Sequence, residues 1–360
     1  MEEENKFSRQ NFLKKLTATG VAVTTSIRGY GTTATQINSS ASYSMIPFPH
    51  SENKKFVPVM ITPFLESGKI DFDGVSRLID FYLAAGVKGF FANCLSSEMY
   101  HLEEGERLAL TRHVVEYVKG AVPVVATGSF GSTVNERVEF AKKIHQTGIA
   151  AVILITSHYA TKEESDDVLL GNMKHMLELT DTIPMGLYEC PSPYKRILSP
   201  EVFKSLLDTN RFVYHKDTSI DREKIKAKLA LLKNSPMEFY DAHTANTIFS
   251  LQHGAKGMSA ISGNFYPEML VWMCNHAGNP AKEKEVQWLQ SELEKTEELI
   301  SKVYPMSSKY FLGKRGIPLH PISRSSTQAL TAQQKQTLDD VYQTFLGWCQ
   351  RLGVQPISGK

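Results

Sequence analysis

The sequence has few cysteines and no long apolar run, and these absences exclude several classes of protein. Four cysteines are scattered over 360 residues, with neither a CxxC pair nor a Cys/His ligand spacing: Cys94, Cys190, Cys274 and Cys349. A disulfide framework and a zinc site are therefore not indicated. No apolar run approaches the roughly 20 residues of a membrane-spanning helix, so we expect no membrane partner.

The chain also lacks a dominant charge. Its 40 basic and 38 acidic side chains give a formal net charge of +2, which creates no general attraction for nucleic acid or an anionic membrane surface. A composition of 42% hydrophobic and 22% charged residues is that of an ordinary globular protein. We therefore expect a small molecule as the partner.

The first fifty residues differ from the rest. Residues 8–15 (Ser-Arg-Gln-Asn-Phe-Leu-Lys-Lys) precede a weakly apolar run at 16–27 and resemble a twin-arginine export signal. Gln10 stands where the second arginine is expected, and no A-x-A cleavage site follows. The segment is therefore either a working export signal, which implies a periplasmic protein, or a relict, which implies a cytoplasmic one. Residues 30–50 are rich in Thr, Ser, Ala and Gly and indicate a linker. We assign 1–50 to a signal or relict plus linker.

From residue 56 onward, short apolar runs alternate with amphipathic segments, a pattern typical of βα units around a parallel sheet. Eight runs have strand character: 57–61, 89–92, 122–127, 151–155, 184–187, 212–215, 238–240 and 257–260. Helical spacing marks the segments 72–85, 103–118, 134–146 and 199–206. Eight strands predict a (β/α)₈ TIM barrel, which we assign to residues 51–279.

Two features complete this prediction. Residues 280–303 and 331–352 have helical composition, so we assign 280–360 to additional C-terminal helices packed on the barrel. A doubly wound open sheet fits the same alternation but requires a glycine-rich phosphate turn after an early strand. The nearest candidate, Gly-Ser-Phe-Gly at 128–131, lacks the third glycine, and the barrel is therefore favoured.

Three sets of residues at predicted strand ends can carry chemistry, because such ends form the mouth of a barrel. Lys216 closes the sixth strand; a desolvated lysine becomes a nucleophilic amine able to form a Schiff base, whereas a lysine snorkelling to solvent is the alternative. Tyr188 ends the fifth strand and can move protons beside that amine, or be a core tyrosine. Residues 93–98 (Asn-Cys-Leu-Ser-Ser-Glu) form a turn suited to a carboxylate, or a merely polar turn.

Several histidines could suggest a metal-binding barrel instead: His158, His215, His243 and His253. However, His215 and Lys216 are neighbours on a strand and face opposite ways, and we find no His/Asp/Glu set with a ligand spacing. We therefore predict neither a metal nor a cofactor. His158 and His243, together with Lys195 and Arg196, favour an anionic or polyhydroxylated substrate. Surface charge is the alternative for all four residues and is the better explanation of Lys195.

The motifs resemble those of the dihydrodipicolinate synthase and N-acetylneuraminate lyase family of pyruvate-dependent class I aldolases. The resemblance extends from about residue 56 to the C-terminus. The family's T-P-F after the first strand stands at 62–64, and its G-[TS]-T-G-E turn corresponds to 94–98. Its Y-N-x-P segment corresponds to 188–191, and its I-K-[ED] strand end to 215–217.

This resemblance implies a role for each position. Lys216 becomes the Schiff-base lysine, Tyr188 the proton-shuttling tyrosine, and Ser96 with neighbouring N–H groups the acceptor of the oxo acid's carboxylate. Tyr159 matches a tyrosine that in many family tetramers reaches the neighbouring subunit's site, so it implies a catalytic contact across a homotetramer or homodimer. The remaining predicted substrate contacts are Ser97, His158, Ala242, His243 and Ser259.

The departures from the family pattern narrow the prediction. Leu95 replaces a hydroxyl residue of the proton relay, so the relay must be shorter or use water. Pro193 replaces an arginine that grips the aldehyde's carboxylate in the synthases, and residues 241–244 differ from the segment that shapes the second-substrate pocket. We predict a carbon–carbon or carbon–oxygen lyase for a 2-oxo acid such as pyruvate or a sugar-acid derivative, distinct from the lysine-pathway synthase. The alternative is a non-catalytic binding or regulatory barrel.

Overall fold

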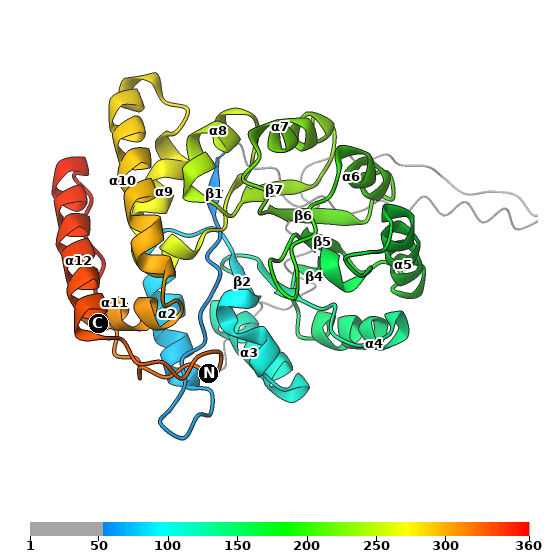
Figure 1. Cartoon of the computed structure of the whole chain (residues 1–360), viewed down its shortest axis with the longest axis horizontal. Helices are drawn as coiled ribbons and strands as arrows, with labels where there is room; N and C mark the ends of the chain where they lie inside the picture. Colours follow the sequence, from blue (N-terminus) through cyan, green and yellow to red (C-terminus); the bar gives the residue numbers. More distant parts are fainter. Residues whose placement is uncertain (1–52, 360) are drawn as a thin grey trace, which may run out of the picture. The chain divides into compact units, whose positions relative to one another are not determined.

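Eight parallel strands form one sheet in the computed structural model, which describes residues 53–359, in the order β1-β8-β7-β6-β5-β4-β3-β2. The strands are β1 (Lys55–Phe56), β2 (Phe90–Asn93), β3 (Val124–Thr127), β4 (Ala151–Ile155), β5 (Met185–Tyr188), β6 (Phe212–Asp217), β7 (Glu238–Asp241) and β8 (Gly257–Met258). A parallel bridge between Val59 and Phe91 joins the segment after β1 to β2. The ring therefore closes, and the predicted (β/α)₈ barrel is confirmed (Figure 1).

The first strand is shorter and earlier than predicted. Its predicted span was 57–61, but β1 covers only Lys55–Phe56 before the isolated bridge at Val59. Pro58 and Pro63 lie within and just after the predicted span, and proline has no N–H to donate to a ladder. The strand is therefore interrupted where the apolar pattern alone predicts continuity.

The last strand also ends early, at Met258 instead of residue 260, and leaves Ser259 just beyond it. Gly257 makes the pairing of β8 with β1 possible, because a Cβ at this position would lie 1.8 Å from the carbonyl oxygen of Lys55.

Helices surround the barrel and follow most of the predicted segments. They are α2 (Phe72–Ala85), α3 (Glu104–Val118), α4 (Val134–His145), α5 (Asp166–Leu179), α6 (Pro200–Leu207), α7 (Arg222–Leu231), α8 (Thr247–Gln252), α9 (Pro267–His276), α10 (Glu283–Ser301), α11 (Met306–Lys314) and α12 (Ala332–Leu352). Side-chain caps begin two of these helices, since Thr133 accepts a hydrogen bond from the N–H of Glu136 and Ser199 from that of Val202. The predicted signal and linker at 1–50 lie outside the described residues.

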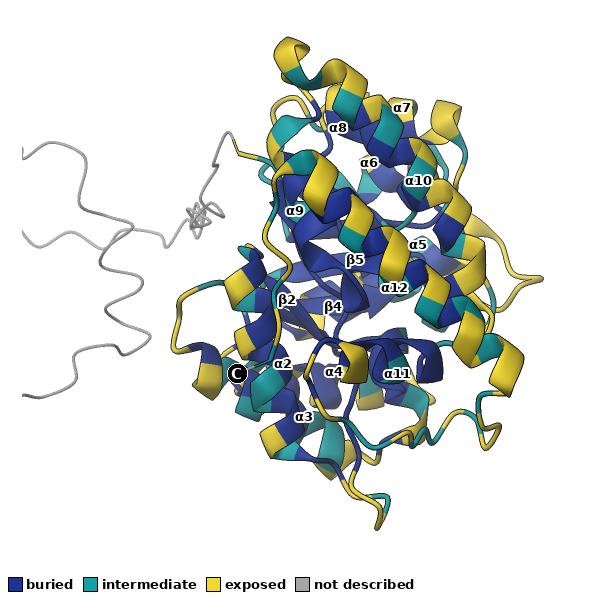
Figure 2. Ribbon diagram, turned by 90° about the vertical axis from the view of Figure 1, so that its left-hand side faces the viewer, coloured by how far each residue is buried: buried dark blue, intermediate teal, exposed yellow. Residues whose placement is uncertain are grey.

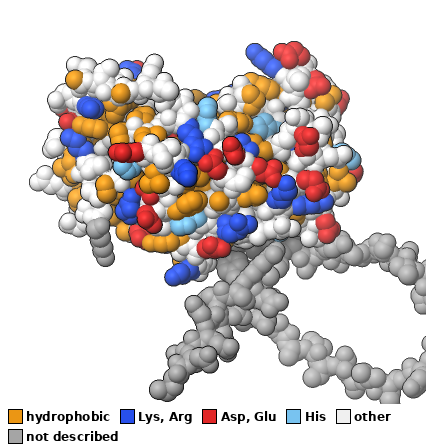
Figure 3. Space-filling model, turned by 90° about the horizontal axis from the view of Figure 1, so that it is seen from below, with side chains coloured by type: hydrophobic (Ala, Val, Ile, Leu, Met, Phe, Trp, Pro, Cys, Tyr) orange, Lys and Arg blue, Asp and Glu red, His pale blue; other side chains and the backbone are white. Residues whose placement is uncertain are grey.

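The C-terminal helices lie beside α9 and α2, and the faces of α10 and α12 that point away from the strands are the exposed ones (Figures 1 and 2). Both were predicted, whereas α11 was not. Among the described residues, no helix combines the length and the hydropathy needed to cross a membrane. On the face seen in Figure 3, basic and acidic side chains are interspersed, as the near-zero net charge leads one to expect.

A buried ion pair ties these helices to the barrel. The guanidinium of Arg315, at the end of α11, donates to both carboxylate oxygens of Glu268 in α9. It also lies 4.7 Å from the ring centroid of Phe81 in α2 and 4.6 Å from that of Phe345 in α12. Arg315 and Glu268 are only 2% and 4% exposed, so water cannot solvate either charge if the other residue is removed.

We expect Arg315→Met to lower the free energy of unfolding by about 3–5 kcal/mol, because it leaves the Glu268 carboxylate buried without its cation. Urea denaturation would measure the change. Lys143→Met is the control: its ammonium lies 2.6 Å from Glu104 Oε1 with both side chains half exposed, and its loss should cost at most about 1 kcal/mol. Equal losses in the two variants would contradict a special role for the buried pair.

Candidate active site

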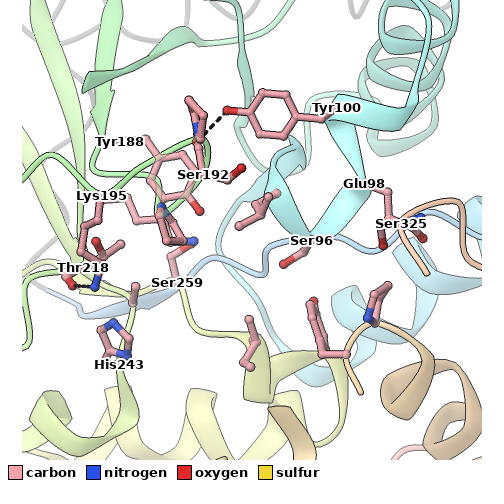
Figure 4. Close-up of a pocket in the computed structure, with 18 of the residues that line it drawn as sticks. Ser96, Glu98, Tyr100, Tyr188, Ser192, Lys195, Thr218, His243, Ser259 and Ser325 are labelled. Atoms are coloured by element: carbon pink, nitrogen blue, oxygen red, sulfur yellow. Dashed lines mark hydrogen bonds between the residues drawn. The ribbon is translucent and has the colours of Figure 1, made fainter. Parts of the chain in front are cut away.

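A cavity of about 650 Å³ opens at the carboxyl ends of the strands (Figure 4). Six of the nine site residues predicted from the sequence line it: Ser96, Tyr188, Lys216, Ala242, His243 and Ser259. They come from the ends of β5 and β6 and from the segments after β2, β7 and β8. The fold thus brings together residues that lie up to 163 positions apart, from Ser96 to Ser259.

Lys216 is buried in this cavity without an acidic partner. It is 4% exposed, and no carboxylate among the described residues pairs with its ammonium group. Its Nζ lies 4.6 Å from the ring centroid of Tyr188 and 5.7 Å from that of Phe91. Burial lowers the pKa of Lys216, because an apolar environment disfavours the charged form. The neutral amine is therefore more accessible here than on a surface lysine.

Tyr188 sits beside Lys216 because the two residues are direct partners in the parallel register of β5 and β6. Side chains in register on neighbouring parallel strands point to the same face. Burial raises the pKa of Tyr188 well above its ordinary value, and the thiol of Cys190 adds to this rise. The hydroxyl is therefore protonated at neutral pH and can donate a proton to a group held at Lys216.

The residues that flank Lys216 face the other way, as the alternation of a strand requires. His215 and Asp217 lie outside the barrel with Glu189, and the Nζ of Lys228 contacts Glu189 and lies 2.7 Å from Asp217 Oδ2. Burial lowers the pKa of His215 to about 4, so the imidazole is neutral. Sequence spacing did not reveal this cluster, whose three possible metal ligands, Glu189, His215 and Asp217, come together in space. The Lys228 ammonium supplies the positive charge between the carboxylates.

The turn after β2 divides its residues between the cavity and the protein interior. Ser96 lines the cavity, whereas Ser97 turns inward: its Oγ accepts from the N–H of Cys94 and lies 2.7 Å from the carbonyl oxygen of Met60. Ser97, predicted as a substrate contact, therefore supports the turn. Glu98 adopts a left-handed conformation (φ 59°), and its Oε1 lies 3.2 Å from the Nζ of Lys309.

His158 and Tyr159 do not line the cavity of this chain. The Nδ1 of His158 donates to the carbonyl of Ser129 (2.6 Å), and its Nε2 lies 3.0 Å from the hydroxyl of Tyr100, which does line the cavity. Burial lowers the pKa of His158 to about 4. The Tyr159 hydroxyl is buried and has no hydrogen-bond partner among the described residues. Its role at a neighbouring subunit's site stays a prediction.

Several residues of the cavity were not predicted as contacts. Lys195, which we also explained as surface charge, lines the cavity and donates to the carbonyl of Thr218 (2.7 Å). Tyr100 donates to the carbonyl of Ser192 (2.7 Å; Figure 4). Glu297 comes from α10, a segment so rich in acidic residues that no pattern singles it out.

Known protein families and relatives of this sequence agree with the geometry of the site. Residues 52–344 match the model of the dihydrodipicolinate synthetase family. The chain belongs to this family. It is 27% identical over 295 residues to a 4-hydroxy-tetrahydrodipicolinate synthase of Oceanobacillus iheyensis, a match that covers 81% of this chain and 97% of that protein. It is 28% identical over 223 residues to a putative 2-dehydro-3-deoxy-D-gluconate aldolase, YagE, of Escherichia coli, covering 60% of this chain and 71% of YagE.

Solved structures of the family have the same fold. YagE in complex with pyruvate has a TM-score of 0.73 at 22% identity, covering 82% of this chain and 99% of that one. A monomeric dihydrodipicolinate synthase variant has a TM-score of 0.74 at 19% identity, covering 82% and 97%. Both the family match and the named relatives confirm the predicted class, a lyase of the class I aldolase type.

We expect Lys216→Met to stabilise the protein by about 0.5–2 kcal/mol, because it removes a buried amine that lacks a compensating charge. The folded-state pKa of Lys216 lies below its unfolded value. Between these two pKa values the folded state binds fewer protons than the unfolded state, so the stability of the wild type rises with pH. The penalty of the wild type then fades, and the advantage of the variant should shrink towards pH 10. Thermal and urea unfolding between pH 7 and pH 10 would measure this.

Lys309→Met is the matched control. Burial also lowers the pKa of Lys309, but its ammonium pairs with Glu98, and removing one partner of a buried pair should destabilise the protein by about 3 kcal/mol or more. If both substitutions destabilise the protein, the view that burial of Lys216, unlike that of Lys309, lowers the stability of the wild type would be contradicted.

Proposed function

We propose that the protein forms a Schiff base between Lys216 and the carbonyl carbon of a 2-oxo acid, and then makes or breaks a carbon–carbon or carbon–oxygen bond next to it. The observation that carries this proposal is a buried lysine that has no carboxylate partner in the described part of the chain, is in strand register with a tyrosine and faces a cavity. A nucleophilic amine needs this environment, since only its neutral form attacks a carbonyl.

Lys216 and Tyr188 carry out different steps of this reaction. The neutral amine of Lys216 adds to the carbonyl carbon, and a proton must then move from nitrogen to oxygen to give the carbinolamine. We assign this transfer to Tyr188, which donates its hydroxyl proton to that oxygen and takes the proton from nitrogen. Tyr188 then donates a second proton to this oxygen and regains it from solvent. The oxygen leaves as water and yields the iminium ion, which accepts the electron pair of the adjacent bond when that bond breaks.

The substrate's carboxylate must bind at a site where it does not pair with the ammonium group of Lys216. We assign it to Ser96, whose turn also directs Glu98 away from the lysine to its own partner, Lys309. Pyruvate is the simplest 2-oxo acid that fits this arrangement, and a relative of known structure binds it. Pro193 offers no charge for an aldehyde's carboxylate, which supports a sugar-acid type of substrate over the synthase reaction.

Borohydride reduction in the presence of pyruvate should attach one pyruvyl unit to Lys216, as mass spectrometry of the digested protein would show. Lys216→Arg should abolish trapping, because a guanidinium stays protonated and is no nucleophile. Lys195→Arg is the control, since Lys195 lines the same cavity and should leave trapping intact. No adduct, or an adduct on a different lysine, would refute the proposal.

Tyr188→Phe should lower kcat by about 10²–10⁴-fold with little change in pyruvate binding, because the hydroxyl moves protons and does not anchor the substrate. Steady-state cleavage rates and the efficiency of trapping would separate the two effects. Tyr117→Phe, an exposed tyrosine on α3 that donates to Asp80, is the control. An unchanged kcat in Tyr188→Phe would refute the role of Tyr188, whereas efficient trapping without any turnover in the wild type would favour the non-catalytic binding barrel.

A further inference from the structure

Glu297 brings a carboxyl group from the C-terminal helices to the cavity wall. Its Oε2 accepts a hydrogen bond from the hydroxyl of Thr244 at 3.0 Å, and no other hydrogen bond or ion pair reaches the group among the described residues. No cation in residues 53–359 compensates its burial, and burial raises the pKa of Glu297 to about 7. A carboxylate can accept about four hydrogen bonds, so most of this capacity, including all of Oε1, is left for a molecule in the cavity.

His243 presents a second unused polar atom to the same cavity. It follows β7 and immediately precedes Thr244, the partner of Glu297. Its Nε2 is buried and has no hydrogen-bond partner among the described residues. Burial, together with the charges of Lys195 and Lys216, lowers the pKa of His243 to about 4, so the imidazole is neutral. Buried polar atoms are normally satisfied, so this nitrogen at the cavity wall is free to bond a water molecule or a substrate hydroxyl.

The neighbours of Glu297 on α10 show that its position is unusual. Glu298 is exposed and its Oε1 lies 3.3 Å from the Nζ of Lys302, while Glu294 accepts a hydrogen bond from Gln290. These are the ordinary contacts of a solvated helix face. Glu297 alone of the three lines the cavity.

A neutral hydroxylated chain suits these groups best. A hydroxyl can donate to the carboxylate or the bare imidazole nitrogen and can accept from a protonated carboxyl. An anionic chain would instead be repelled by Glu297 whenever it is ionised. A cavity of about 650 Å³ lies within the range that binds drug-sized ligands, so it has room for a chain longer than that of pyruvate.

We propose that Glu297, with His243, is the specificity-determining residue for the part of the substrate beyond the bond that breaks, and that it selects a 2-oxo acid with an uncharged, polyhydroxylated chain. This inference rests on the proposed function, because it assumes that the oxo-acid end of the substrate is held at Lys216 and Ser96. It assigns to the C-terminal helices a direct role in substrate choice.

The test compares two 4-hydroxy-2-oxo acids of equal length, one hydroxylated at every carbon beyond the fourth and one without those hydroxyls. The wild type should cleave the hydroxylated acid with a kcat/KM at least about tenfold higher, since a site built to bond a hydroxyl rejects an analogue that lacks it. Glu297→Leu should lose most of this preference, because its kcat/KM falls much further for the hydroxylated acid than for the other acid. Glu297→Gln keeps both donor and acceptor and should retain most of the preference.

Glu298→Gln is the matched control on the same helix and should behave as the wild type. The inference is overturned if Glu297→Leu lowers kcat/KM equally for both acids, or if the wild type prefers an analogue ending in a carboxylate. Pyruvate trapping at Lys216 is measured in every variant: a missing preference with intact trapping refutes only the role of Glu297, whereas absent trapping in the wild type refutes the proposed Schiff base itself.

Discussion

The site depends on a lysine that is buried without a counter-charge. Lys216 and Lys228 illustrate the point, since both are buried near the carboxyl end of β6. Burial alone would lower the pKa of each, but the carboxylates of Glu189 and Asp217 raise the pKa of Lys228. No carboxylate between residues 53 and 359 does the same for Lys216. One ammonium therefore becomes a structural cation and the other a candidate nucleophile. The alternation of side chains along one strand is enough to separate the two environments.

The C-terminal helices complete this environment. Lys309 of α11 pairs with Glu98 beside the cavity, so the acidic side chain nearest the substrate turn is already engaged. Glu297 of α10 provides part of the cavity wall. The buried pair of Arg315 and Glu268 ties α11 to α9, and the same helices that stabilise the barrel therefore also shape the space into which a substrate extends.

Much of the fold and the centre of the site could be predicted from the sequence. Apolar runs of strand length identify the barrel, and the strand-end positions of Lys216 and Tyr188 place both in its mouth. The limits of the first strand were wrong because Pro58 interrupts a ladder that hydrophobicity alone predicts to be continuous. Ser97 was predicted as a substrate contact but faces the protein interior, and Lys195 lines the cavity although surface charge also explained it. Whether a side chain points into a cavity depends on local turn geometry, which the sequence does not show.

Contacts distant in sequence were the hardest to foresee. Glu297 lies in a helix whose other acidic residues meet solvent, so its role depends on how α10 packs against the barrel. The cluster of Glu189, His215, Asp217 and Lys228 joins three elements, and no ligand spacing along the chain reveals it.

The most direct test of a Schiff base at Lys216 is a structure determined from crystals of the protein soaked in pyruvate. The account predicts continuous electron density from Lys216 Nζ to the second carbon of pyruvate, with the carboxylate at Ser96 and the Tyr188 hydroxyl within hydrogen-bond distance of the adduct. Pyruvate bound elsewhere, or lying in the cavity with no bond to Lys216, would contradict it.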